Sequence, residues 1–149
     1  MTPVSKSIAN GGRRDAPPPA AVDIDRPEVV AEVTSAFTAY EQALMDNDVA
    51  AMNAAFFGGA VRYGLAECQY GAEAIAAWRA VAEPVPAGRS LGPTVVTTFG
   101  TDAACVSTEF RYPGGLDIGR QTQTWIRFAE GWRIVNAHVS TLPMQEEPG

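Results

Sequence analysis

The sequence predicts one α+β domain in which N-terminal helices pack on one side of a strongly curved antiparallel sheet. Apolar residues recur every three or four positions between residues 30 and 44, which is the period of one helix face. From residue 94 onward, β-branched and aromatic residues alternate with polar ones between short breaks that contain glycine, a pattern typical of antiparallel strands. Helices followed by a meandering sheet indicate the α+β class. With 149 residues, the chain is long enough for one domain with its own core.

The first helix is the most strongly patterned element. Asp25, Pro27 and Glu28 form a helix-start signature, and the apolar stripe after them predicts a helix to about Met45. The stripe consists of Val30, Val33, Phe37, Tyr40 and Leu44. The residues before this helix, 1–25, are small, polar and rich in proline and glycine, and we expect a disordered leader there. We expect the folded domain to cover residues 26–142 and a loose tail to cover residues 143–149.

Shorter elements are expected between the first helix and the main sheet. Asp48 is placed to cap a second, short helix, which Gly58–Gly59 would end. Val61–Gly64 is expected to form a short strand, with Glu67–Tyr70 returning beside it. A third helix is expected from residue 72, and it should stop before the prolines that begin at residue 84.

The last two strands are expected to form a hairpin, and its two faces differ in chemistry. Strands are predicted at 94–99, 103–112, 119–128 and 132–140, with Gly131 in the final turn. If Phe128 pairs with Trp132, Gln121, Gln123 and Trp125 share one face with Val135, Ala137 and Val139. The other face carries Arg120, Thr122, Thr124, Ile126, Ile134, Asn136, His138 and Ser140. Both faces are partly apolar, so both should be covered, and polar groups inside the sheet indicate a lined cavity.

Composition excludes several classes of function. Eleven basic and seventeen acidic residues give a net charge of −6, which argues against binding to nucleic acid but not against a small anionic substrate. Two cysteines without metal or redox spacing fit a reducing cytoplasm. No apolar run is long enough for a membrane helix, and the N-terminus lacks the apolar stretch of a secretory signal.

The chemistry-bearing residues favour a site without metal or cofactor. His138 is the only histidine, and no phosphate-binding loop, dinucleotide-binding glycine pattern or serine-nucleophile motif is present. Any catalysis is therefore expected to use tyrosine, arginine, glutamate or glutamine. Tyr40 lies on the apolar stripe, so it is either a core tyrosine or a proton donor or acceptor in a pocket. Arg62 alternates with Val61 and Tyr63, and it either lies in water or, on a covered face, binds an anion such as a carboxylate.

Further candidates lie on the predicted sheet and the third helix. Gln121 and Gln123, two apart on one β-face, can offer donors and acceptors to a urea-like or carboxyl group, or can form a solvated or interfacial polar stripe. Trp125, which shares their face, and Arg79, at the pocket rim, are also expected to bind the substrate. His138, on the opposite face beside Thr122, is expected to be structural or interfacial. We expect the charges of Glu109 and Arg111 at the surface or an interface.

The order of elements, together with the C-terminal motif Thr124–Ser140, resembles the nuclear-transport-factor-2-like (SnoaL-like) superfamily, whose fold is a cone of curved sheet wrapped around helices with a cavity inside. The final hairpin is also similar to that of the association domain of calcium/calmodulin-dependent kinases, where the face matching Gln123 and Val139 lines the cavity. This resemblance implies that the glutamine face points inward. We expect a homodimer formed through the outer face of the sheet.

A closer resemblance is to the AtzH-like (HpxZ-like) proteins that accompany bacterial amidases in oxalurate and cyanuric acid catabolism. It covers residues 26–142. Its motifs are Tyr40-Glu41-x-Ala43-Leu44, Asn47-Asp48-Val49, Val61-Arg62-Tyr63-Gly64, Tyr70-Gly71-x-Glu73-Ala74-Ile75, Gly119–Trp125 and Ala137–Ser140. The chain departs from the family in a shorter link before Arg62 and in its proline-rich leader. The resemblance implies a cofactor-free decarboxylating amidohydrolase that converts a small N-carboxylated urea, such as 1,3-dicarboxyurea, to allophanate, with Tyr40 and Arg62 as the catalytic pair.

Two other functions remain open at this stage. The first is a non-catalytic carboxylate-binding or assembly partner of an amidase. The second is an isomerase, dehydratase or cyclase on the same fold, which needs an acid or base such as Glu109 on the cavity wall.

Overall fold

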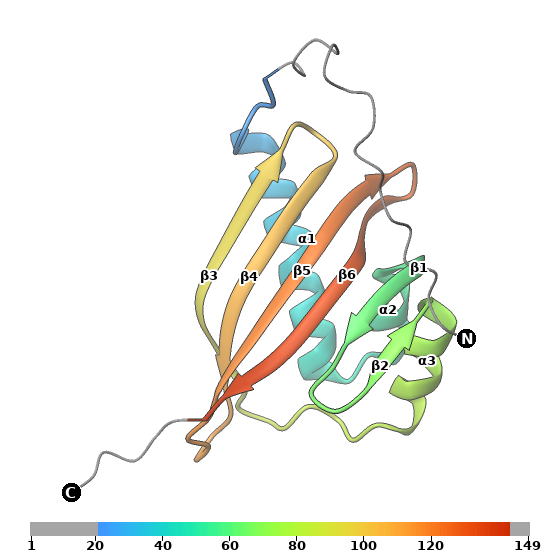
Figure 1. Cartoon of the computed structure of the whole chain (residues 1–149), viewed down its shortest axis with the longest axis vertical. Coiled ribbons are helices and arrows are strands. Elements are labelled where there is room, and N and C mark those ends of the chain that lie inside the picture. The colour runs from blue at the N-terminus through green and yellow to red at the C-terminus, as the bar shows by residue number, and fades with distance from the viewer. Residues whose placement is uncertain (1–20, 144–149) are drawn as a thin grey trace, which may run out of the picture.

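The computed structural model describes residues 21–143, so most of the expected leader and tail lies outside the described residues. Figure 1 shows the helices and strands of this part of the chain. They are α1 (Pro27–Asp46), α2 (Val49–Ala54), β1 (Phe56–Tyr63), β2 (Cys68–Tyr70), α3 (Ala72–Val81), β3 (Ser90–Phe99), β4 (Ala103–Arg111), β5 (Ile118–Phe128) and β6 (Gly131–Leu142). No helix among the described residues is both long enough and apolar enough to cross a membrane.

One curved sheet contains all six of these strands, in the order β2-β1-β6-β5-β4-β3. Neighbouring strands are antiparallel except for β1 and β6, which run parallel. The long helix α1 lies along one face of β3–β6, while α2 and α3 lie beside the short strands β1 and β2 (Figure 1). The α+β class and the placement of the helices on one side of the sheet are confirmed.

The core lies between α1 and the inner face of the sheet. Val33 of α1 and Ile134 of β6 are fully buried, and Trp125 of β5 is only 1% exposed. Fully burying a side chain of this kind contributes roughly 1.5–3 kcal/mol to stability. The predicted helix stripe is confirmed except at its start, where Val29 rather than Val30 is buried.

The segment before α1 is tied to β3. Asp25 has a positive φ of 57°, and its carboxylate accepts a hydrogen bond from the Thr98 N–H at 2.9 Å. Ile24 forms an isolated bridge to Phe99. The expectation that Asp25 caps α1 is therefore wrong, since Arg26 stands at the N-cap and its side chain makes no capping hydrogen bond. The sequence motif could not separate a capping carboxylate from one that binds a strand distant in sequence.

Asp48 caps α2 as predicted, with its carboxylate accepting from the Ala51 N–H at 3.1 Å. The prediction that Gly58–Gly59 ends this helix is wrong. The helix ends at Ala54, and β1 begins at Phe56, which pairs with β6 and buries its ring. The glycine pair lies within β1, where the register against β6 shifts between Phe56 and Val61. Pairing with the neighbouring strand therefore keeps β1 extended through two glycines, which would weaken an isolated strand.

The final hairpin contains a bulge that moves one predicted residue to the other face. Phe128 pairs with Gly131 rather than Trp132, and the register shifts by one residue at Val135. Ile134 consequently lies opposite Trp125 in the core, which corrects its predicted place on the outer face. Beyond the bulge, Gln121 and Gln123 are buried on the inner face, as predicted.

Candidate functional site

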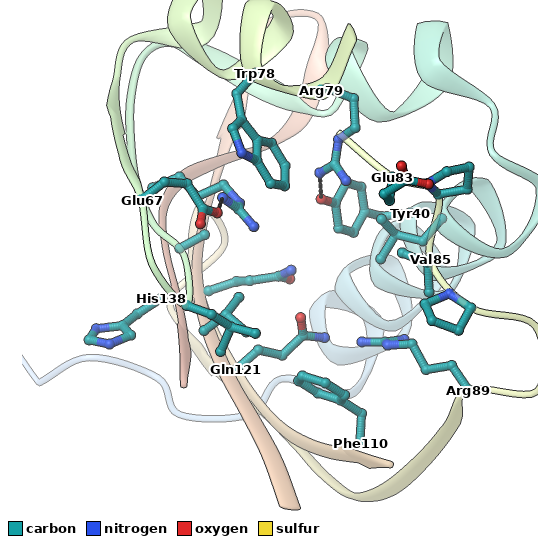
Figure 2. Close-up of a pocket in the computed structure, with 18 of the residues that line it drawn as sticks. Tyr40, Glu67, Trp78, Arg79, Glu83, Val85, Arg89, Phe110, Gln121 and His138 are labelled. Atoms are coloured by element: carbon teal, nitrogen blue, oxygen red, sulfur yellow. Dashed lines mark hydrogen bonds and ion pairs between the residues drawn. The ribbon is translucent and has the colours of Figure 1, made fainter. Parts of the chain in front are cut away.

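A cavity of about 330 Å³ lies between α1, α3, the inner face of the sheet and the loop that leads into β3 (Figure 2). This volume is at the lower end of the range for small-molecule sites, which begins at about 300 Å³. Its polar and aromatic lining comes from α1, α3, β1, β4, β5, β6 and the loops between them. These lining residues include Tyr40, Arg62, Glu67, Trp78, Arg79, Glu83, Arg89, Phe110, Gln121 and Gln123.

Two arginines approach the same indole ring at one end of the cavity. Arg62 lies 4.2 Å from the centroid of Trp78, and Arg79 lies 5.0 Å from it. One Arg62 nitrogen donates to Glu67 at 2.9 Å and to Gln69 at 3.0 Å. Arg79 makes no ion pair among the described residues, and its Nε is buried without a hydrogen-bond partner. This end of the cavity therefore holds two guanidinium groups and the paired carboxylate of Glu67, and Figure 2 shows Glu83 close to Arg79 and Tyr40.

Tyr40 projects from α1 into this positively charged end. Its ring packs edge-on against Phe56 at 5.7 Å, and its hydroxyl accepts a long hydrogen bond of 3.4 Å from Arg79 (Figure 2). Burial raises the pKa of Tyr40 above its ordinary value, and the charges of Arg79 and Arg62 offset part of that rise. Tyr40 is therefore protonated at neutral pH and can donate a proton to a ligand.

The pKa values of the neighbouring charged groups follow from the same arrangement. Burial lowers the pKa of Arg79, and the nearby charge of Arg62 acts in the same direction. Burial alone would raise the pKa of Glu67, but hydrogen bonds from Arg62 and the Ala66 N–H outweigh it and lower the pKa. A bound anion would reduce the repulsion between the two guanidinium groups, so the site favours an anionic ligand.

A second ion pair lies at the other end of the cavity. Arg89, in the loop before β3, pairs with Glu41 of α1, and their side chains are 4% and 8% exposed. Glu41 also accepts a hydrogen bond of 2.7 Å from the Gln121 amide. The guanidinium of Arg89 lies 4.5 Å from the ring centroid of Phe110. Both charges are satisfied within the protein, so this pair serves to hold the loop and Gln121 in place.

Of the candidates that the sequence suggested, Tyr40, Arg62, Arg79, Gln121 and Gln123 meet around the cavity. Trp125 does not. It is buried behind the lining, and its indole N–H donates to Gln123 at 2.9 Å. The prediction that Trp125 contacts the substrate is therefore corrected, because its contact with the site runs through Gln123.

His138 is among the residues that line the cavity, but its imidazole points away from it, and Glu109 is not among the lining residues. Figure 2 shows the imidazole of His138 pointing away from the other labelled side chains, and its ring is 5.9 Å from that of exposed Tyr63. Glu109 is half-buried and alternates along β4 with the buried Thr108 and Phe110, so its side chain is on the outer face. Within residues 21–143, no group of three or more histidine, cysteine, aspartate or glutamate side chains could hold a metal ion.

Several residues of the site were not expected from the sequence, and Glu41, Glu67 and Arg89 are the ones that form its ion pairs. Glu41 had a signal, since it continues the four-residue spacing of Val33 and Phe37 on the buried side of α1, and a charged residue at such a position needs a partner. The sequence contains no comparable signal for Glu67 and Arg89. Both lie in loops, where no periodic pattern reports the direction of a side chain.

The fold and its cavity define the class of protein. The structure is similar to an NTF2-like protein from Pseudomonas putida KT2440, with a TM-score of 0.70 and 20% identity over 82% of this chain and 92% of that one. It is also similar to a ketosteroid isomerase-like protein from Erwinia carotovora atroseptica, with a TM-score of 0.66 and 17% identity over 80% and 100%. At these identities the likeness establishes the fold alone, and the chain has the nuclear-transport-factor-2-like fold.

The comparison with family models identifies a narrower group within this fold. The chain belongs to the AtzH-like family, whose model matches residues 22–145. A cystatin-like fold protein from Burkholderia xenovorans LB400 is 53% identical over 84% of this chain and 100% of its own, with a TM-score of 0.80. A comparison with curated proteins found no match. The predicted family resemblance is therefore confirmed.

Proposed function

We propose that the protein is a cofactor-free enzyme that acts on a small N-carboxylated urea, of the type 1,3-dicarboxyurea to allophanate, by a decarboxylating cleavage of a C–N bond. The observation that carries the proposal is Arg79, a cationic side chain without a carboxylate partner in the described residues, next to the protonated hydroxyl of Tyr40 in the cavity. The carboxylates of the substrate supply the anion, and the glutamines of the sheet suit its urea group.

The reaction requires one proton. The C–N bond to a terminal carboxylate breaks, carbon dioxide leaves, and the nitrogen keeps the bonding electrons and gains a proton. The dianion of 1,3-dicarboxyurea plus one proton thus gives the allophanate monoanion and carbon dioxide. No ammonia is released in this step.

In this scheme Tyr40 is the proton donor. Its hydroxyl transfers a proton to the departing nitrogen, and the charge of Arg79 stabilises the tyrosinate until water restores the proton. Arg62, held by Glu67 and Gln69, binds the other carboxylate through donors that these partners leave available. The arrangement orients the substrate between two cations without a metal ion.

The test is carbon dioxide release from freshly prepared 1,3-dicarboxyurea above the spontaneous rate, for wild type beside Tyr40→Phe. We expect Tyr40→Phe to lower kcat by roughly 100-fold or more, the usual contribution of a positioned proton donor. Tyr63→Phe is the matched control, since Tyr63 is exposed on the outer face, and it should keep wild-type activity. Turnover that is unchanged in Tyr40→Phe refutes the role of Tyr40. No turnover by folded wild type favours a carboxylate-binding partner of an amidase.

We propose that a second copy of the chain covers the outer face of the sheet. The register places Val95 and Tyr63 in one row with the polar residues Ser107, Thr122 and His138, and Val95 is 60% exposed. Val95 lies on β3, and an exposed apolar side chain on the outer face of a sheet is stabilised when another protein surface buries it. Light scattering should give the mass of a dimer for wild type and of a monomer for Val95→Asp. A wild-type monomer contradicts this assembly.

A further inference from the structure

The two glutamines of β5 are fixed in opposite orientations, and each leaves one hydrogen-bonding atom without a partner in the described residues. An ionised carboxylate only accepts hydrogen bonds, so Gln121 must turn its NH₂ group toward Glu41. An indole N–H only donates, so Gln123 must turn its carbonyl oxygen toward Trp125. The chemistry of the two partners thus determines which end of each amide remains available.

The available atoms are an acceptor and a donor on the cavity wall. Figure 2 shows the oxygen of Gln121 pointing into the cavity and its nitrogen turned toward the Arg89 side. Gln123 has its oxygen engaged, so its NH₂ group is the end left for a ligand. Both residues are on the inner face, two positions apart on one strand, which places their side chains next to each other.

We propose that Gln121 and Gln123 are specificity-determining residues that select a ligand carrying an N–H donor and a C=O acceptor close to its carboxylate. The N–H of the ligand donates to the Gln121 oxygen, and the ligand carbonyl accepts from the Gln123 nitrogen. A urea or amide next to a carboxylate satisfies both, whereas a dicarboxylate of the same shape places an acceptor against the Gln121 oxygen. This inference rests on the proposed function, because it names the feature by which the same cavity distinguishes its substrates.

Glu41 and Trp125 are positioning residues in this scheme. Neither is among the residues that line the cavity, yet each holds one glutamine in the orientation that the ligand needs. Arg89 in turn holds Glu41. A ligand that turns an acceptor toward the Gln121 oxygen leaves that buried acceptor without a hydrogen bond. This costs about 1–3 kcal/mol, which corresponds to a roughly tenfold to hundredfold loss of affinity.

The test uses two probes of equal size, ureidoacetate and succinate, which differ by an N–H in place of CH₂ and an amide in place of a carboxylate. Binding to folded protein is measured by calorimetry, and the ratio of the succinate Kd to the ureidoacetate Kd is compared between variants. The difference in ligand charge is the same for each variant, so a change in the ratio isolates the glutamines. We expect Gln121→Met and Gln123→Met to lower the ratio at least tenfold.

Two further variants complete the experiment. Gln123→Leu is a second uncharged variant without the donor, so it should lower the ratio even if Gln123→Met does not fold. Thr124→Val, on the outer face of the same strand, should leave the ratio unchanged. An unchanged ratio in the folded Gln121 and Gln123 variants overturns the inference, as does failure of folded wild type to bind ureidoacetate. Release of carbon dioxide from 1,3-dicarboxyurea tests the proposed function separately, so the two failures are distinguishable.

Discussion

The buried pair of Glu41 and Arg89 gives a stability prediction that can be worked from the structure. Both side chains are more than 90% buried, so replacing one partner leaves the other charge out of water. Such a change typically costs about 3–5 kcal/mol. We therefore expect Glu41→Gln and Arg89→Met each to lower the free energy of unfolding by about 3 kcal/mol, which lowers Tm by roughly 10 °C in a domain of this size.

The double variant Glu41→Gln/Arg89→Met should recover most of this loss, because it removes both buried charges together. Replacing a whole buried pair with neutral residues is often close to neutral, so the expected coupling energy is at least about 2 kcal/mol. Urea unfolding monitored by circular dichroism measures all four corners of the cycle. The exposed pair Arg127 and Asp102, with side chains 43% and 64% exposed, is the control and should couple by less than about 1 kcal/mol. Single-variant costs below about 1 kcal/mol for the buried pair refute this reasoning.

Three further predictions concern Tyr40, the sheet and α2. The pKa of Tyr40 is raised in the folded state, so its contribution to stability is present below the ordinary value of 10.0 and is lost as pH rises above that value. Tyr40→Phe should therefore lose less stability at alkaline pH than wild type, as measured by urea unfolding. Gly119→Ala places a methyl group against the ring of Phe110 and should cost about 1–3 kcal/mol, whereas Gly58→Ala meets no atom within 4 Å and should cost less than 1, both measured by urea unfolding. Asp48→Ala removes the cap of α2 and should lower the free energy of unfolding by about 1 kcal/mol, and a cost near zero contradicts that role.

The sequence predicted those parts of the fold that repeat a local pattern. The stripe of α1 extends over several turns, so an error at one position, such as Val30, does not change the assignment. Alternation correctly separated Arg62 from its neighbour Tyr63, because it needs only the strand to be recognised, but the choice between water and a covered face for Arg62 was left open and is decided by the structure.

The parts that could not be predicted depend on contacts between distant segments. A bulge at Val135 exchanges the faces of the residues before it, and this register buries Ile134 opposite Trp125 in the core. The same limit applies to the site. Tyr40 was found because it lies on a periodic helix, while Arg89 follows a proline-rich loop whose path across the cavity is set by its ion pair with α1.

The partners of the carboxylates in and behind the cavity wall also bear on the choice between proton donation and proton abstraction. An isomerase or dehydratase on this fold needs a carboxylate able to take a proton from a carbon atom, and Glu109, the candidate for that role, is on the outer face. Glu67 has a lowered pKa and is therefore a weak base, and Glu41 is already bonded to Arg89 and Gln121. Tyr40, by contrast, has a raised pKa and a hydroxyl that contacts only a cation. Tyr40 is thus arranged to protonate a departing nitrogen, whereas removal of a proton from carbon would have to use Glu83, the lining carboxylate that has no ion pair among the described residues.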